Sequence, residues 1–356
     1  MFSVRRGWAV VTAQAVGELV TPTGVLVSAA EPETEEWYAA RRAGITGTDL
    51  PMITGYSRYG NALSVWLDKR GELEDTAGEA ARWGQLLEDV VAREWARRND
   101  VDVRPVGVLA HAEEGWRRVS LDRLVDACPD EAGGRCGLEV KTRSAFTAGR
   151  YRDDIPDDVL AQVEWGLPVT GLDHMHVAVL LGGQELREFR IDRDEDLEDF
   201  LYAAAAPVWE AVRNGYPPAV SPDGDGLLLG LLNKLYEKRS GERHLDPVEA
   251  GRWLTAYAAG HDAARAGERL KTQAKTALVR MLDDAEIGLV DERVAFTYRR
   301  PAPGPKVTAA GLKRLAVNKP ALFDALMDDG YITVSKPGPR FDLKQIDEQT
   351  DEGSEA

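Results

Sequence analysis

The sequence predicts an α/β fold, a central sheet flanked by helices, followed by a mostly helical C-terminal region with a small hairpin. Three observations lead to this prediction. Segments with helical spacing or helix-start residues alternate with short extended runs between residues 37 and 215. A Gly-Gly pair at residues 182–183 separates two of these runs, as in a β-hairpin. Of the 356 residues, 44% are hydrophobic, which suffices for a sizeable core.

The first elements are expected to be helices that follow a short lead-in. Residues 1–36 hold a Thr-Pro-Thr-Gly turn between two Val-rich runs and then an acidic linker. A helix, a Gly-containing turn and a second helix that begins near Asn61 come next. A third helix is expected over residues 78–98, where one face carries Ala81, Gly84, Glu88, Val91 and Trp95. Glu88 therefore lies in an apolar face, and an ion pair at the helix edge is the alternative explanation for it.

The sheet is expected to follow this helix, because extended runs cover residues 106–112, 116–127 and 137–143. The loop between the last two runs has a length compatible with a hairpin, which would place Asp122 and Glu139 on neighbouring antiparallel strands. Along the run GLEVKTR, side chains alternate between faces, so that Glu139 and Lys141 share the face opposite to Val140. A solvated polar face is the alternative for this strand taken alone.

A crossover helix, two strands and a closing helix complete this part of the chain. Pro156 suits the first turn of a helix, and this helix carries Gln162. Beyond a boundary at residues 215–226, a long helix is expected to begin at Asp246-Pro247 and to reach about residue 284. A hairpin, a helical stretch and a strand are then expected over residues 288–300, 308–329 and 331–336.

The formal net charge of −16 argues at first against nucleic acid, because contacts to phosphate draw on clustered Lys and Arg. The distribution of charge weakens that objection. Residues 1–220 carry 24 basic and 38 acidic side chains, whereas residues 221–346 carry 20 and 17, and the last ten residues carry five acids. An acidic half that holds metal cations, beside a mildly basic second half, is compatible with DNA.

Several classes of protein and site are disfavoured by what the sequence lacks. No run of about 18 consecutive apolar residues and no signal-peptide pattern occurs, so a cytoplasmic chain without a membrane segment is expected. Cys128 and Cys136 cannot form a disulfide framework or a four-thiolate zinc or iron–sulfur site, and reduced thiols are expected. His174 and His176 share one strand face but have no third ligand nearby in sequence, so no metal site is expected there. The tryptophans expected in the core rather than as base-stacking platforms are Trp83, Trp95 and Trp165.

Five polar residues are expected to converge at one edge of the sheet: Glu88, Asp122, Glu139, Lys141 and Gln162. Three acids so placed would be costly unless cations compensate them. Oxygen ligands from Asp and Glu suit a hard cation such as Mg²⁺, and the lack of a Cys/His cluster in the sequence speaks against zinc. Lys141 would orient or deprotonate an attacking water, or offset charge on a phosphate.

Five sequence blocks occur in a fixed order: WYAARRAGITGTD, WGQLLEDVVAREW, SLDRLVD, LEVKT and AQVEWGLPVTGLDHMHVAVLLGG. Together they span roughly residues 37–215, and they resemble the YqaJ viral recombinase family, relatives of the lambda-type phage exonuclease in the PD-(D/E)XK nuclease superfamily. A lone pair of short motifs recurs by chance, whereas five ordered blocks are specific. The resemblance implies a PD-(D/E)XK nuclease core, in which a mixed central sheet is flanked by helices.

The resemblance also implies roles for individual residues. Asp122, Glu139 and Lys141 match the superfamily's catalytic acid, second acid and lysine, and Glu88 matches the helix glutamate that completes the metal site. The backbone carbonyl of Val140 is a further candidate metal ligand. Gln162 matches the glutamine of a QxxW-like block that lies at the site, here QVEW.

By the same resemblance, Arg41 and Thr48 match the arginine and the small hydroxyl residue that receive a terminal phosphate. Relatives commonly carry Ser where Thr48 stands, so the hydroxyl is kept and a methyl group is added. Charge-assisted hydrogen bonds from such a pair to a 5′ phosphate favour 5′-to-3′ digestion.

The function that the resemblance implies is a Mg²⁺-dependent deoxyribonuclease, an exonuclease that digests one strand from the ends of double-stranded DNA for phage-type recombination. Two metal ions are expected, with Mn²⁺ as a substitute. A structure-specific or single-strand endonuclease on the same core and a non-catalytic DNA-binding scaffold stay open as alternatives. A single-strand annealing protein and a second copy of the chain are the open alternatives for a protein partner.

The expected divisions of the chain are a lead-in (1–36), a nuclease domain (37–218), a helical and hairpin region (219–346) and an acidic disordered tail (347–356). Residues 293–346 hold ten basic and four acidic side chains. Scattered surface charge is one explanation for this excess, and a segment that lies along the DNA duplex is the other.

Overall fold

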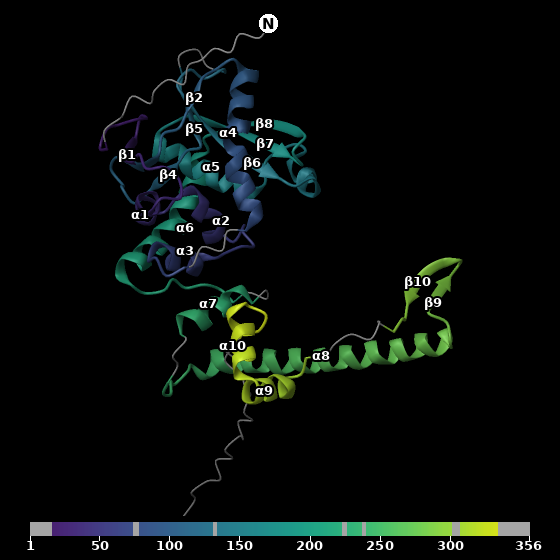
Figure 1. The fold of residues 1–356 in the computed structure, drawn as a ribbon. Helices are drawn as coiled ribbons and strands as arrows, with labels where there is room; N and C mark the ends of the chain where they lie inside the picture. Colours follow the sequence, from purple (N-terminus) through teal and green to yellow (C-terminus); the bar gives the residue numbers. More distant parts are fainter. Residues whose placement is uncertain are drawn as a thin grey trace, which may run out of the picture. The chain divides into compact units, whose positions relative to one another are not determined.

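The computed structural model describes residues 16–73, 78–130, 134–222, 226–236, 240–300 and 307–333 of the chain. Two compact units, Met1–Leu235 and Tyr236–Ala356, make up the protein. The first unit holds every residue that the sequence predicts for the site (Figure 1).

A five-stranded mixed sheet forms the centre of the first unit. Its strand order is β2-β5-β6-β7-β8, and the strands are Val103–Arg104, Arg123–Val125, Cys136–Arg143, His174–Leu181 and Glu185–Asp192. The pair β6–β7 is parallel and is joined by the crossover helix α5 (Asp157–Thr170), whereas the other pairs are antiparallel. The β7–β8 turn has positive φ angles at both Gly182 and Gly183, as the predicted hairpin requires. The predicted mixed sheet with flanking helices is therefore confirmed.

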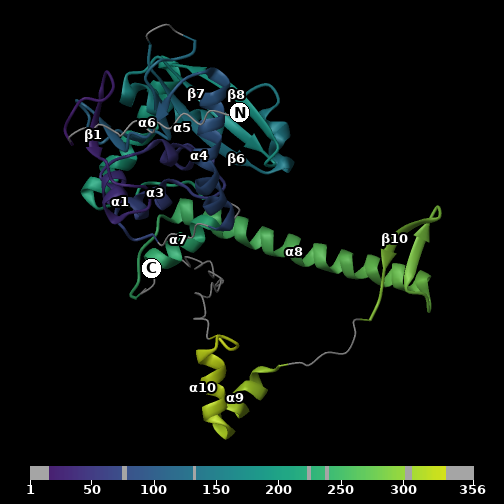
Figure 2. The ribbon, with the colours of Figure 1, turned by 45° about the horizontal axis from the view of Figure 1, so that its top comes forward.

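Helices cover both faces of this sheet. On one face, Leu138 and Val140 of β6 pack with Trp95 of α4 (Glu79–Asn99). Figures 1 and 2 show α4 beside the strands of this sheet. On the other face, Val177 of β7 packs in a larger cluster with Trp165 of α5. The alternation along β6 that the sequence predicts thus separates an α4 face from an α5 face.

The N-terminal half of α4 differs from the prediction. Its buried residues begin at Val91, and Trp83 is 56% exposed, whereas Trp95 is fully buried. The expectation that Trp83 lies in the core is wrong, because in the described chain no apolar layer covers the first turns of the helix. A Cβ added at Gly84 of this helix would lie 3.4 Å from Thr142 Oγ1, an ordinary contact.

A second sheet and a group of short helices pack beside the central layers. The sheet has the order β1-β3-β4, with strands Gly24–Ser28, Val108–His111 and Arg118–Ser120. Strand β1 lies in the segment expected to be a lead-in. The remaining helices of this unit are α1 (Glu35–Arg42), the 3₁₀ turn η1 (Gly47–Asp49), α2 (Leu50–Ile53), α3 (Ala62–Lys69), α6 (Glu195–Asn214) and α7 (Leu227–Leu235).

Helix α7 belongs to the first unit because of its apolar contacts. Its buried Leu228 packs with Leu63, Trp66 and Leu67 of α3. The indole Nε1 of Trp66 donates to the carbonyl of Ala211 in α6 at 3.1 Å, which fixes α3 against α6.

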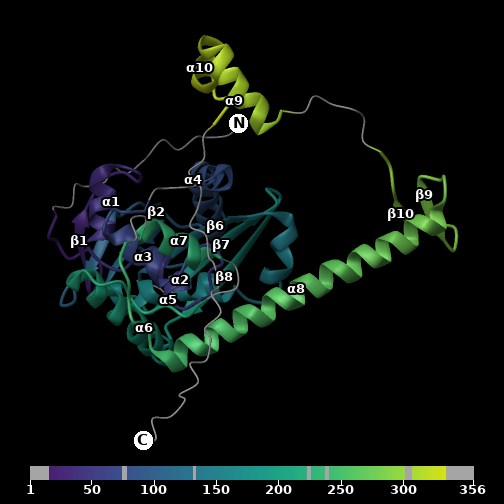
Figure 3. The same ribbon diagram turned by 90° about the horizontal axis from the view of Figure 1, so that it is seen from below.

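The second unit is mostly helical with one hairpin, as predicted. Helix α8 (Pro247–Leu282) begins where the side chain of Asp246 accepts the backbone N–H of Glu249, and it leads into the hairpin of β9 (Ile287–Val290) and β10 (Arg293–Thr297) (Figure 3). Helices α9 (Ala309–Asn318) and α10 (Pro320–Asp328) follow. Residues 331–333 are not a strand, and the rest of the strand expected there, like the acidic tail, lies outside the described residues. Among the described residues, no helix is both long and apolar enough to cross a membrane.

Candidate active site

Asp122 lies at the point where the pairing between β5 and β6 ends. The last pair in the ladder is Arg123 with Leu138, and beyond it Asp122 Oδ2 accepts the backbone N–H of Val140 at 2.7 Å. Since the N–H and C=O of one strand residue point to the same side, the Val140 carbonyl faces Asp122 rather than β7. The predicted antiparallel placement of Asp122 beside Glu139 is therefore observed, and it leaves a backbone carbonyl at the same edge.

Glu139, Lys141 and Gln162 form a closed hydrogen-bonded triangle. The Lys141 ammonium donates to Glu139 Oε1 and, at 2.9 Å, to Gln162 Oε1. The Gln162 amide donates to Glu139 Oε1 at 2.6 Å. Glu139 is only 5% exposed, so the alternative of a solvated polar face does not describe this strand. The triangle joins β6 to α5 and holds the lysine in one place.

Glu88 faces the site from α4 as one half of an ion pair. Arg123 donates to Glu88 Oε1 at 2.7 Å and to Asp89 Oδ1 at 3.2 Å, and the same guanidinium donates to the backbone carbonyl of Asp122. The ion pair that the sequence offered as an alternative is thus present, and it ties Glu88 to the residue beside Asp122. Arg123 was not foreseen as part of the site, because its partner Glu88 comes from another element of the chain.

The charges around Asp122 raise its pKa well above the ordinary value. Burial is the largest cause, followed by the negative charges of Glu139 and Glu88, while Lys141 and the Val140 N–H act in the opposite direction. A bound cation would relieve the repulsion between these three carboxylates. The atoms at this edge that could ligate a metal are all oxygens, from three carboxylates and the Val140 carbonyl, and this set fits a hard divalent cation.

Arg41 and Thr48 meet in a small polar group at the start of η1. Arg41 donates to Thr48 Oγ1 at 2.6 Å, and its guanidinium stacks 4.4 Å from the centre of the Trp37 ring. Beneath them, Asp49 accepts the Thr46 hydroxyl at 2.9 Å and pairs with buried Lys69 at 2.6 Å. The predicted phosphate-binding pair is therefore brought together on a fixed base, with Thr48 exposed.

The turn that carries Thr48 packs directly on the helix that carries Gln162. A Cβ added at Gly47 would lie 2.6 Å from the backbone oxygen of Gln162, so only glycine allows this approach. Burial lowers the pKa of Arg41, and the charges of Asp49, Asp68, Glu139 and Asp122 oppose that shift. Arg41 thus lies in the electrostatic field of the acids, and all the predicted site residues belong to one region of the first unit.

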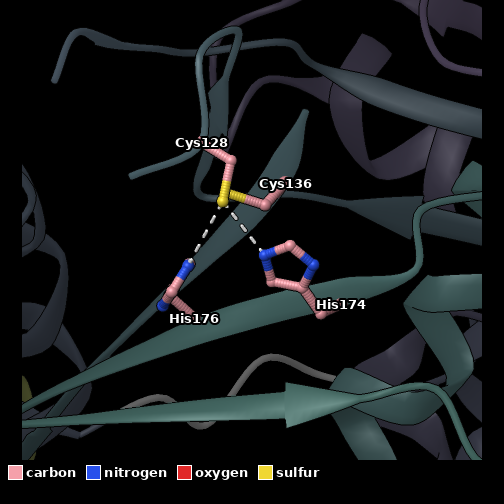
Figure 4. Close-up of side chains that lie close together, drawn as sticks. All are labelled: Cys128, Cys136, His174 and His176. Atoms are coloured by element: carbon pink, nitrogen blue, oxygen red, sulfur yellow. Dashed lines mark hydrogen bonds between the residues drawn. The ribbon is translucent and has the colours of Figure 1, made fainter. Parts of the chain in front are cut away.

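A second group of side chains differs from what the sequence predicts. The sequence shows no Cys/His cluster, and no metal site was expected at His174 and His176. The structure places Cys128, Cys136, His174 and His176 together in a buried cluster (Figure 4). The lack of a third ligand near the histidines in sequence misled the prediction, because the register of β6 with β7 supplies one from another strand.

Comparisons with known proteins give a family match and a curated relative. A family model described as "YqaJ-like viral recombinase domain" matches residues 36–173. The protein "Uncharacterized protein YqaJ" of Bacillus subtilis (strain 168) is 32% identical over 235 residues, which cover 64% of this chain and 71% of that protein.

Similar solved structures are more distant. The crystal structure of LHK-Exo in complex with dAMP has 18% identity and a TM-score of 0.44, and it is covered over 94% of its length by 51% of this chain. An alkaline exonuclease (LHK-Exo) from Laribacter hongkongensis has 17% identity and a TM-score of 0.43 over the same shares. A phage related exonuclease from Haemophilus somnus 129PT has 10% identity and a TM-score of 0.36, with 48% of this chain and 94% of that chain covered. These TM-scores mark a limited likeness.

Proposed function

The chain belongs to the YqaJ-like viral recombinase family of phage-type nucleases, and we propose that it is a divalent-metal-dependent exonuclease that digests one strand of duplex DNA from a 5′ end. The observation that carries the proposal is the edge of the sheet where Asp122, Glu139 and the Lys141–Gln162 pair converge. A scaffold protein would have no need of three acids and a lysine held at one partly buried spot.

The metal ligands in this proposal are Asp122, Glu139, Glu88 and the carbonyl of Val140. Their chemistry supports Mg²⁺, with Mn²⁺ as a substitute, because all four offer oxygen. A bound divalent ion would supply charge stabilisation at the phosphodiester and a more acidic water. The raised pKa of Asp122 supports the same assignment, since a carboxyl crowded by other acids gains most from a cation.

Lys141 acts on the substrate through its ammonium group. Two of its three N–H groups are directed to Glu139 and Gln162, which leaves one donor for a phosphoryl oxygen or the attacking water. Gln162 holds the lysine from α5 and also donates to Glu139, so it orients both residues. The lysine thereby offsets negative charge that develops on the phosphate during hydrolysis.

Arg41 and Thr48 recognise the end of the DNA in this proposal. A guanidinium and a hydroxyl 2.6 Å apart can both donate to one terminal phosphate, and the stack on Trp37 limits the positions of the guanidinium. Their attachment to α5 through Gly47 supports a fixed separation between the end of the strand and the acids. A 5′ phosphate bound by this pair of residues gives 5′-to-3′ polarity.

The decisive experiment is digestion of linear duplexes labelled at either end, with a 5′ phosphate or a 5′ hydroxyl, in the presence of Mg²⁺ or EDTA. We expect Mg²⁺-dependent loss of the 5′ label from phosphorylated ends, and no cleavage of closed circles. Arg41→Gln should abolish the preference for the phosphate, whereas Arg42→Gln, which loses an ion pair with Asp68 and a contact with the Tyr38 ring, should keep it. Cleavage of circles or branched DNA without an end requirement would favour the endonuclease alternative.

Variants of the acids test the site itself. Asp122→Asn and Glu139→Gln should abolish Mg²⁺-dependent cleavage, while Asp126→Asn, an exposed acid that pairs with Arg104, should leave it unchanged. A carboxyl whose pKa is raised by folding lowers the stability of the fold as the pH rises from its ordinary pKa to the raised one, so Asp122→Asn should unfold no more easily than the wild type in EDTA. Ordinary activity in either site variant would refute the assignment.

A further inference from the structure

Two cysteines and two histidines form one buried cluster on the α4 face of the sheet. All four side chains are buried, and one ligand atom from each lies within 4.8 Å of the others (Figure 4). Both cysteines of the chain and two of its five histidines meet here. The ligand set is two sulfurs and two imidazole nitrogens.

The strands explain why these residues meet. Cys136 is the first residue of β6, and Cys128 lies at the other end of the preceding loop, where its N–H donates to the carbonyl of Gly134 at 2.9 Å. His174 and His176 are two residues apart on β7, so they share one face. The parallel register sets Leu138 beside His176, which brings both rings next to the start of β6.

The distances match a site that one ion could fill. Cys128 Sγ lies 3.1 Å from His174 Nε2 and 3.8 Å from His176 Nε2. In a tetrahedral zinc site with these ligand types, neighbouring ligand atoms lie roughly 3.3–3.8 Å apart. Small movements of the side chains therefore suffice to bring all four atoms to one ion. Asp130, whose Oδ2 lies 3.6 Å from His176 Nε2, is bound by Arg190 at 3.2 Å at the rim of the cluster.

The surroundings favour a metal complex without net charge. Apolar residues enclose the cluster, among them Trp95, Val125 and Ala178, and the Trp95 ring centre lies 5.1 Å from that of His176. Two thiolates, two neutral imidazoles and one divalent ion sum to zero charge, which suits such a site.

We propose that Cys128, Cys136, His174 and His176 bind one zinc ion in a closed, structural site. Two sulfur and two imidazole ligands are the set that zinc prefers, and four protein ligands leave no position for a substrate. The ion would fasten the β5–β6 loop to β7. Cys136 and Glu139 lie on the same strand with side chains on opposite faces. The zinc would therefore hold β6 from the α4 face of the sheet, and the cation of the acids would lie on the other face.

The first measurement is the metal content of the full-length protein, purified without chelators and with reducing agent. We expect one zinc per chain by elemental mass spectrometry, and release of that zinc into a colorimetric chelator when a mercurial blocks the thiols. The matched variants Cys136→Ser and His176→Asn should lose the zinc, whereas His244→Asn, an exposed histidine of the second unit, should retain it. Asp122→Asn should also retain it, which separates this site from the nuclease metals whether or not the protein cleaves DNA.

A cobalt-substituted wild-type protein covers the case in which the variants fail to fold. Protein prepared with Co²⁺ should show the visible bands of a tetrahedral cobalt–thiolate complex, and zinc should bleach them. A folded, reduced wild-type protein that binds neither zinc nor cobalt in stoichiometric amount would overturn the proposal. A Cys128–Cys136 disulfide in the purified protein, or loss of zinc in Asp122→Asn with retention in Cys136→Ser, would overturn it equally.

Discussion

At the scale of single residues, Lys141 is the side chain whose contribution can be separated most cleanly from metal binding. An ammonium cannot ligate a cation, so Lys141→Ala should lower turnover by about 10²–10³-fold, the usual effect of removing one preorganised charge-stabilising group. The Mg²⁺ concentration for half-maximal activity should change little. Steady-state kinetics over a Mg²⁺ series measure both quantities. Lys271→Ala, which removes an exposed lysine paired with Glu268, is the matched control. Turnover near the wild-type value would make Lys141 a structural partner of Glu139 and nothing more.

Some of the residues at the site could be predicted from the sequence and others could not. Strand alternation places Glu139 and Lys141 on one face by local geometry alone, and their contacts with Gln162 agree with that prediction. Arg123 could not be assigned in the same way, because its partner Glu88 comes from another element. The Cys/His cluster was missed for a related reason: the spacing of the cysteines is unlike a short zinc motif, and the histidines reach them only through the register of two parallel strands.

At the scale of elements, Glu164 links helix α5 to helix α6. Its side chain is fully buried, and its Oε1 accepts the backbone N–H of Asp194, the N-cap of α6, at 2.7 Å. Burial raises the pKa of Glu164 from 4.5 to about 7. The folded protein therefore holds this proton more tightly than the unfolded chain, and stability falls as the pH rises from about 4.5 to about 7.

Glu164→Gln tests this coupling, because glutamine keeps the acceptor for Asp194 but cannot ionise. The difference in free energy of unfolding between the variant and the wild type should shift in favour of the variant by up to roughly 3 kcal/mol between pH 5 and pH 8. Urea titrations at the two pH values measure the effect. Glu195→Gln, an exposed acid in the first turn of α6, should show no such dependence. Equal differences at both pH values would mean that the Glu164 carboxyl ionises normally.

The order of the helices and strands could be predicted from the sequence more completely than the way they pack. Capping residues and hairpin glycines mark the start of α3, α8 and the β7–β8 turn in the sequence itself. The partner of β1 could not be read in this way, because β3 lies about 80 residues further along the chain. Trp83 was expected in the core as a large aromatic residue, but the residue type does not tell how far the apolar layer that covers α4 extends.

At the scale of the whole molecule, the question is what the second unit contributes. A truncation after residue 218 would remove α7 and expose the apolar side of α3 that Leu228 covers, so the better cut follows Leu235, where the first unit ends. If basic residues of the second unit contact DNA, the truncated protein should cleave short duplexes but bind long ones with a smaller salt dependence. For each phosphate that the truncated chain no longer neutralises, the slope of log affinity against log salt should shrink by about 0.9.

Binding of long duplexes over a salt series compares the full and truncated chains. Arg299→Gln is a control for the same substitution at Lys313 or Arg314. Because Arg299 pairs with Glu286 at 3.4 Å, its positive charge is already partly compensated within the protein. Four further basic residues of this stretch, Lys306, Lys336, Arg340 and Lys344, lie outside the described residues. An unchanged salt slope would favour the scattered-charge explanation and a protein partner, such as a single-strand annealing protein, for this unit.

The close approach of Gly47 to Gln162 has one more consequence. Because not even a methyl group fits between the turn and the helix, the backbone beside Thr48 lies directly against Gln162, which in turn is hydrogen-bonded to Glu139. Under the proposed function, the pair that binds the 5′ phosphate and the acids that hold the metal are then a fixed distance apart. Each cycle would then release a product of the same length, whatever the sequence, and a gel of the products would show a single size. A ladder of product sizes would mean that this distance is not fixed.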